Sequence, residues 1–85
     1  MVSITRVQTG VRLEVRLVKV LKGLAEYLDL SLGELLEGIV LHAFDGKPIF
    51  NPQTAEVVEQ LRRVYGLELR AEDSHNLDDG VKEKP

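Results

Sequence analysis

Cysteine and tryptophan are absent from this 85-residue sequence, and aromatic residues make up only 5% of it. Without cysteine there is no disulfide and no thiolate metal site, so we expect a protein of a reducing compartment, the cytoplasm. The scarcity of rings argues against binding nucleic acid by stacking bases on exposed aromatic side chains. Apolar runs are only a few residues long, so we expect neither a membrane span nor a signal peptide.

Motifs for catalysis are also missing. The sequence contains no nucleophile motif, no glycine-rich phosphate loop and no dinucleotide fingerprint. His42 and His75 lie far apart in the sequence and do not have the spacing of metal ligands. Paired acid–base chemistry needs buried carboxylates in a cleft, whereas four glutamates fall at exposed helix positions: Glu34, Glu37, Glu56 and Glu59. We therefore expect no enzyme, no metal site and no cofactor.

Charge is distributed unevenly along the chain, although the net charge is only −3. Residues 1–23 carry five basic side chains and one acidic one, a net charge of +4. Residues 24–70 carry four basic and eight acidic side chains, and residues 71–85 have a net charge of −3. A basic N-terminal third on an acidic remainder suggests that the first third has an anionic partner.

Hydrophobic periodicity changes within the first 28 residues. Residues 7–17 alternate between apolar and polar, which predicts a half-buried strand. Residues 17–28 then repeat their apolar side chains at intervals of three and four, which predicts a helix. Residues 14–17 fit both patterns, and neither a proline nor a good N-cap residue marks the boundary.

Two further helices have clear end signals. Ser31 and Glu34 form a capping box before an apolar stripe that should stop near Asp45-Gly46. Asn51 and Pro52 predict the start of a third helix, which Gly66 should end. Leu67 and Leu69 alternate with charged residues and could form a short strand.

We divide the chain into three parts. Residues 1–45 contain the predicted strand and the first two helices, and residues 46–70 are an extension with the third helix. Residues 71–85 are polar, acidic and aperiodic, so we expect a disordered tail.

A lone strand followed by two amphipathic helices cannot form a stable monomer. The strand would leave its backbone groups unpaired, and two short helices cannot enclose a core. Two copies that pair their strands antiparallel and interlock their helices solve both problems. The pattern therefore predicts an obligate, two-fold symmetric homodimer.

The residues that carry this pattern resemble the ribbon-helix-helix family of DNA-binding proteins, to which the Arc and MetJ repressors belong. The resemblance rests on Val11-Arg12-Leu13, Leu24-Ala25-Glu26 and Ser31-x-x-Glu34-Leu35-Leu36, and it covers about residues 7–44. It implies a mainly α fold with one N-terminal β-strand, an intertwined homodimer with a two-stranded antiparallel ribbon, and an extra C-terminal helix. Residues 1–45 would then be the dimerisation and DNA-binding core. The ribbon would enter the major groove of double-stranded DNA, and the protein would be a transcriptional regulator, most simply a repressor.

The resemblance also implies which residues contact DNA. Arg6, Gln8, Gly10 and Arg12 would lie on the outer face of the ribbon, where arginine can read guanine and glutamine can read adenine. Ser31, Leu32 and Gly33 would hold a phosphate at the start of the second helix. Gly10 stands where family members usually present a reading side chain, and Leu30 stands near where a glycine is common. The first helix also lacks the usual proline near its start.

Two alternatives stay open at this point. The protein could be an interaction module or an antitoxin-like protein of the same fold, binding a protein partner through residues 46–85. Alternatively, residues 11–28 could form one continuous helix in a helical bundle. Assembly of dimers into dimers of dimers along DNA is a further expectation.

Overall fold

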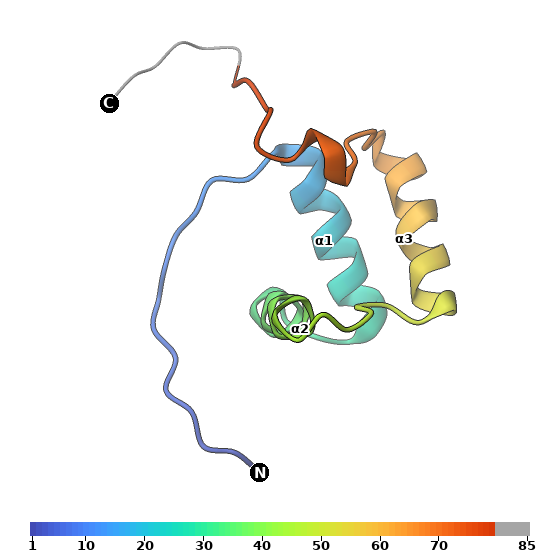
Figure 1. The fold of residues 1–85 in the computed structure, drawn as a ribbon. Helices are drawn as coiled ribbons and strands as arrows, with labels where there is room; N and C mark the ends of the chain where they lie inside the picture. The colour runs from blue at the N-terminus through green and yellow to red at the C-terminus, as the bar shows by residue number, and fades with distance from the viewer. Residues whose placement is uncertain (80–85) are drawn as a thin grey trace.

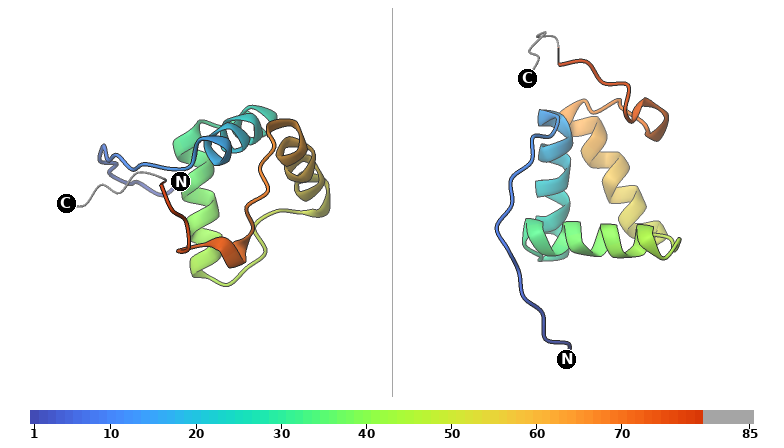
Figure 2. Two further views of the ribbon diagram at one scale, coloured as in Figure 1. Left: turned by 90° about the horizontal axis from the view of Figure 1, so that it is seen from above. Right: turned by 60° about the vertical axis from the view of Figure 1, so that its left-hand side comes forward.

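The computed structural model describes residues 1–79, and all of its regular structure within them is helical (Figure 1). Helix α1 spans Val15–Leu28, α2 spans Leu32–Phe44 and α3 spans Pro52–Tyr65. A short 3-10 turn, η1, follows at Ala71–Asp73. Residues 1–13, which we call the N-terminal arm, run as an extended chain beside the helices (Figures 1 and 2).

The expected ribbon-helix-helix fold with its N-terminal strand is wrong for this structure. Residues 1–79 contain no strand and no sheet, so there is no two-stranded ribbon. The arm is extended as its alternating pattern predicted, but a β-strand also needs a neighbour that accepts and donates its backbone hydrogen bonds. The described part of the chain supplies none. Leu67 and Leu69 likewise lie in an irregular segment instead of the short strand expected there.

The start of α1 is set by a residue that the sequence did not single out. Glu14 is the N-cap, and its carboxylate accepts a hydrogen bond of 3.0 Å from the Leu17 amide. The helix therefore begins at Val15, which excludes both a strand that continues to residue 17 and a helix that starts at residue 11. Asp29 ends α1 in the left-handed conformation, with φ of 61°.

The limits of α2 and α3 confirm the sequence signals. Ser31 Oγ accepts from the Glu34 amide and the Glu34 carboxylate accepts from the Ser31 amide, so the capping box is complete. Asn51 caps α3 by accepting from the Thr54 amide at 2.8 Å, and Pro52 occupies the first turn. Gly66 ends α3 with φ of 69°, a left-handed conformation that glycine adopts without steric cost.

The core lies where α1 contacts the other two helices. Leu24, only 2% exposed, forms its centre with Ala25 and Leu35. Side chains of α2, α3 and the connection between them pack around this centre, so α3 covers α1 and does not project as a free arm. The surrounding apolar side chains are Leu21, Leu28, Ile39, Phe50, Val57, Val58 and Leu61.

Residues 66–79, which we call the C-terminal segment, return from α3 to the beginning of α1 (Figure 2). Leu67 is buried, and the Arg62 guanidinium donates a hydrogen bond to the Leu69 carbonyl. Arg16 of α1 donates to the Gly66 carbonyl at 3.1 Å. We expected residues 71–85 to be a disordered tail. The described part of it, residues 71–79, comes directly after residues that these contacts hold in place. Residues 80–85 of that tail lie outside the described residues.

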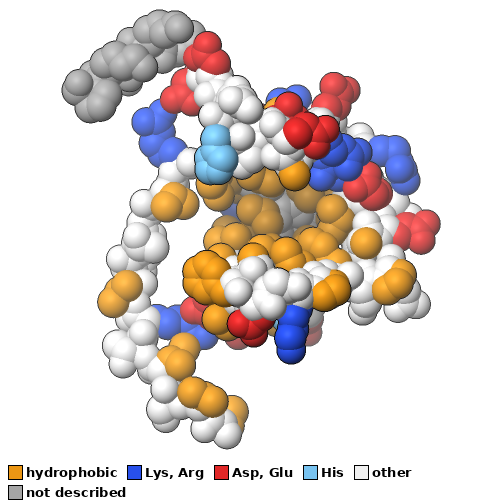
Figure 3. Space-filling view, viewed as in Figure 1, with side chains coloured by type: hydrophobic (Ala, Val, Ile, Leu, Met, Phe, Trp, Pro, Cys, Tyr) orange, Lys and Arg blue, Asp and Glu red, His pale blue; other side chains and the backbone are white. Residues whose placement is uncertain are grey.

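This chain leaves more surface uncovered than a compact monomer does. Its accessible surface is 7484 Å², whereas a compact 9.5 kDa protein exposes roughly 5000 Å². The arm contributes to the excess, and Figure 3 shows apolar side chains gathered in the hollow between α2 and the C-terminal segment. No helix within residues 1–79 is both long and apolar enough to cross a membrane.

Candidate functional site

The N-terminal arm carries most of the predicted DNA contacts, and every one of its residues is exposed. Its charged side chains contact the rest of the chain at two places. Arg6 reaches α2, and Arg12 reaches the C-terminal segment. The arm is therefore an extended, solvated chain with two electrostatic anchors.

The first anchor is a two-pronged hydrogen bond between Arg6 and Glu37. The Arg6 guanidinium donates from Nε and Nη2 to the two Glu37 carboxylate oxygens at 2.8 and 2.9 Å. This hydrogen bonding raises the pKa of Arg6 and lowers the pKa of Glu37. Such a fork fits a carboxylate and would fit a phosphate equally well.

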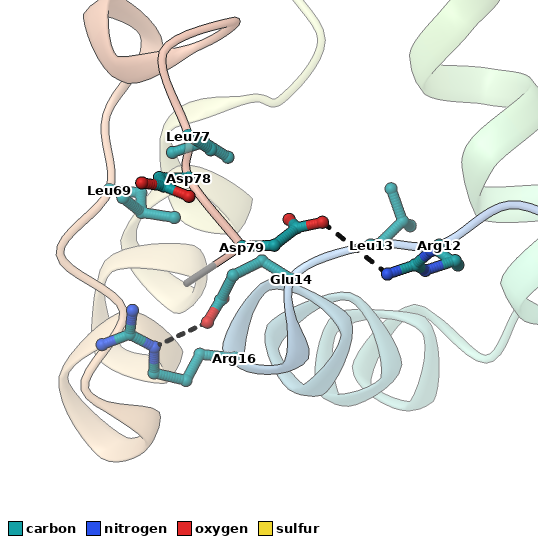
Figure 4. A pocket seen from close by; sticks show the side chains of 8 residues that line it. All are labelled: Arg12, Leu13, Glu14, Arg16, Leu69, Leu77, Asp78 and Asp79. Atoms are coloured by element: carbon teal, nitrogen blue, oxygen red, sulfur yellow. Dashed lines mark hydrogen bonds and ion pairs between the residues drawn. The ribbon is translucent and has the colours of Figure 1, made fainter. Parts of the chain in front are cut away.

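The second anchor is the ion pair of Arg12 with Asp79. Arg12 Nη2 lies 3.7 Å from the Asp79 carboxylate, and the Arg12 side chain is 90% exposed. Both residues of the pair line a hollow of about 670 Å³, whose walls combine charged side chains of both signs with leucines (Figure 4). The lining residues include Arg12, Arg16, Glu14, Asp78, Leu69 and Leu77.

Gln8 and Gly10 lie between the two anchors. The Gln8 side chain makes no hydrogen bond to the rest of residues 1–79. A Cβ built on Gly10 would have no atom within 4 Å, and its φ is not in the left-handed region. Neither packing nor backbone conformation therefore requires glycine at this position of the chain.

Two other cations of the basic N-terminal third, Arg16 and Lys19, lie against the helical body. Arg16 donates to Glu14 at 3.0 Å and to the Gly66 carbonyl, and Lys19 lies 6.0 Å from the centre of the Tyr65 ring. Burial disfavours the charged form of Glu14, but hydrogen bonds from Leu17 and Arg16 outweigh that effect and lower the pKa of Glu14. Arg16 and Lys19 thus help to join α1 to the end of α3.

The N-terminus of α2 is the third predicted part of the site. The capping box satisfies the Glu34 amide, and the amides of Leu32 and Gly33 have no acceptor within the helix. A hydrogen bond from the Ser31 amide lowers the pKa of Glu34, so this helix start already carries a carboxylate. Glu34 also acts electrostatically on Arg6, so the structure brings Arg6 to the first turns of α2. Arg12, by contrast, lies beside the C-terminal segment, where it pairs with Asp79.

An exposed apolar surface on α2 is a feature that the sequence reasoning missed. With Ile4 of the arm it lines a hollow of about 440 Å³. We call this group the α2 apolar surface, and it consists of Ile4, Leu36, Val40, Leu41 and Phe44. The signal was the width of the apolar stripe, because it is wider than the face that one short helix buries against its own chain.

His42 has a local structural role. Its Nδ1 lies 2.7 Å from the Gly38 carbonyl one turn earlier in α2, which is hydrogen-bond distance. Among residues 1–79, His, Asp and Glu side chains form no group of three or more that could hold a metal ion. Comparisons with protein-family models, with curated proteins and with solved structures found no match for this chain.

Proposed function

We propose that this protein binds double-stranded DNA as a homodimer through its N-terminal arm and regulates transcription. The observation that carries the proposal is the arm itself, an exposed, extended and basic segment on an otherwise acidic body. A segment in this state has its backbone and its cationic side chains accessible to a long anionic ligand.

Charge segregation supports the arm as the contact surface. Residues 1–23 have a net charge of +4, whereas residues 24–79 carry four basic and twelve acidic side chains. An acidic body repels the phosphate backbone, so attraction is strongest where the arm and the start of α1 lie. The net negative charge of the protein therefore does not argue against DNA binding. Repulsion of the acidic body would turn the basic arm towards the DNA.

Individual residues of the arm have chemistry suited to different parts of DNA. Arg12 and Gln8 are the proposed base readers, since a guanidinium can pair with guanine and a carboxamide with adenine. Gly10 between them lets the backbone approach closely. Arg6 and the amides of Leu32 and Gly33 are proposed to hold phosphates, which fix position and not sequence.

Dimer formation is supported by the α2 apolar surface. Phe44 is 79% exposed and Leu41 is 62% exposed, which is unusual for neighbours on one short helix. Gly38 precedes them in α2, and a Cβ built on it would meet no other part of residues 1–79 within 4 Å. A glycine inside a helix costs about 1 kcal/mol relative to alanine, so its use here is consistent with close approach of a second copy.

The proposal is tested by fluorescence-anisotropy titration of a randomised duplex pool, repeated at several salt concentrations and followed by selection of bound sequences. Binding should weaken steeply with salt because phosphate contacts release counterions. On the selected duplex, Arg12→Ala should lose about 1–3 kcal/mol of binding free energy. Arg63→Ala on α3 is the matched control and should bind as the wild type does. Absence of binding at low salt would overturn the proposal.

A protein partner is the second candidate function. It is favoured by Val64 at the end of α3, whose side chain is 71% exposed in the described structure, and by the adjacent Tyr65, which is 39% exposed. In that case residues 46–85 would hold the partner, as expected of an antitoxin-like protein. A stoichiometric complex that Val64→Glu disrupts, together with no DNA binding, would favour this candidate.

A further inference from the structure

We propose that the end of the C-terminal segment, residues 77–79, competes with DNA for Arg12 and so restrains DNA binding from within the same chain. This inference rests on the proposed function of the arm. It adds a regulatory contact to that function, in which Asp79 occupies the acceptor position at Arg12 that a guanine or a phosphate would take.

The path of the C-terminal segment is fixed by contacts that lie before residue 77. Leu67 is buried, Arg16 donates to the Gly66 carbonyl, and the Arg62 guanidinium donates to the Leu69 carbonyl. The Arg70 amide donates to the Asp73 carboxylate at 2.8 Å, which starts the η1 turn. These contacts bring residues 77–79 back to residues 12–16, which include the start of α1 and lie more than 60 positions earlier in the sequence.

Between the N-terminal arm and the C-terminal segment there is an ion pair beside a partly apolar hollow. Arg12 Nη2 lies 3.7 Å from the Asp79 carboxylate, and Asp78 lines the same hollow (Figure 4). Leu77 and Leu69 form its apolar wall together with Leu13. Asp79 therefore pairs with the residue proposed to read bases, and Asp78 lines the same hollow beside Leu69 and Leu77.

The strength of this contact decides what it can do. An exposed ion pair is individually weak, so the contact cannot abolish binding to a polyanion. Because both partners belong to one chain, however, the effective concentration of the carboxylates at Arg12 is high. The contact is therefore expected to weaken DNA binding modestly. Duplexes to which Arg12 contributes enough binding free energy to displace Asp79 would be favoured.

The experiment compares two full-length variants that lose the same charge. Asp78→Asn/Asp79→Asn removes the competing carboxylates, and Glu26→Gln/Glu56→Gln removes two exposed carboxylates on α1 and α3. On the selected duplex, the first variant should bind about two- to tenfold more tightly than the second, since the affected contact is a surface ion pair. Equal affinity of the two variants, with wild-type binding intact, would overturn this inference alone. If the wild type binds no duplex at low salt, the proposed function and this inference both fail.

A second measurement reports the contact without relying on affinity. The chain has no cysteine, so Asn76→Cys accepts a single nitroxide label next to residues 77–79. The label should broaden the amide signals of residues 11–13, and saturating duplex should restore them. Broadening that persists in the DNA complex would contradict competition, because the segment would then stay in place while the arm holds DNA.

Discussion

Arg6 of the N-terminal arm donates two hydrogen bonds to Glu37 of α2, although 31 positions separate the two residues. This pairing ties an otherwise solvated segment to the helical body. It also joins a residue proposed to contact phosphate to the helix whose first amides are proposed to do the same.

Breaking this anchor should release the first half of the arm without unfolding the protein. We expect Glu37→Gln, with a nitroxide label at Ser3→Cys, to give a narrower electron paramagnetic resonance spectrum than the labelled parent. The thermal midpoint should stay nearly the same, because exposed ion pairs contribute little to stability. Glu56→Gln, which removes an exposed carboxylate from α3, is the control and should leave the spectrum unchanged. An equally mobile label in the parent would show that Arg6 does not hold the arm.

Placing a charge on the α2 apolar surface should separate the proposed dimer. Phe44→Glu should weaken self-association at least about tenfold, since burying one large apolar side chain is worth about 1.5–3 kcal/mol. Sedimentation equilibrium measures this change, and Val64→Glu at the end of α3 is the matched control. A wild-type chain that sediments as a monomer at all concentrations would refute the assignment of this surface.

Truncating the centre of the core should destabilise the whole domain. Leu24 is 2% exposed and belongs to the buried cluster against which side chains from all three helices pack. Leu24→Ala should therefore lower the free energy of unfolding by about 2–5 kcal/mol, through lost burial and the cavity left behind. Urea denaturation followed by circular dichroism gives the value. Val64→Ala, at an exposed site of the same apolar type, should change it by less than about 0.5 kcal/mol.

The capping box of α2 should make stability depend on pH in the acid range. Hydrogen bonds from Ser31 lower the pKa of Glu34 below its ordinary value of 4.5. The folded state thus favours the ionised carboxylate, and its contribution is complete above about pH 4.5 and disappears as pH falls through the lowered value. We expect the wild type to be more stable than Glu34→Gln at pH 7, with the gap narrowing towards pH 3.

The control for this titration is Glu56→Gln. The Glu56 carboxylate is exposed on α3 and does not cap a helix. Urea midpoints of the three proteins across the pH range provide the test. A gap between wild type and Glu34→Gln that stays constant from pH 7 to pH 3 would show that the capping carboxylate is not linked to folding.

Helix limits were readable from the sequence wherever a local signal sets them. Ser31 with Glu34, Asn51 with Pro52, and Gly66 act on backbone groups within four residues of themselves, so their effect needs no knowledge of the rest of the chain. Glu14 was missed as a cap because it lies inside an alternating run and glutamate is not a favoured N-cap residue. The three-and-four spacing of the leucines in α1 indicated the face that carries Leu24 and Ala25.

Tertiary structure decided the features that depend on distant partners. Alternation in residues 7–13 determined an extended chain, but whether such a chain becomes a strand depends on a hydrogen-bonding neighbour, which residues 1–79 do not provide. The same holds for the candidate site. The sequence analysis placed Arg6 and Arg12 on one face of a strand, and only the folding of α2 and of the C-terminal segment assigned Arg6 to Glu37 and Arg12 to Asp79. Charge pairing acts through space, so the order of residues alone could not fix which carboxylate each arginine meets.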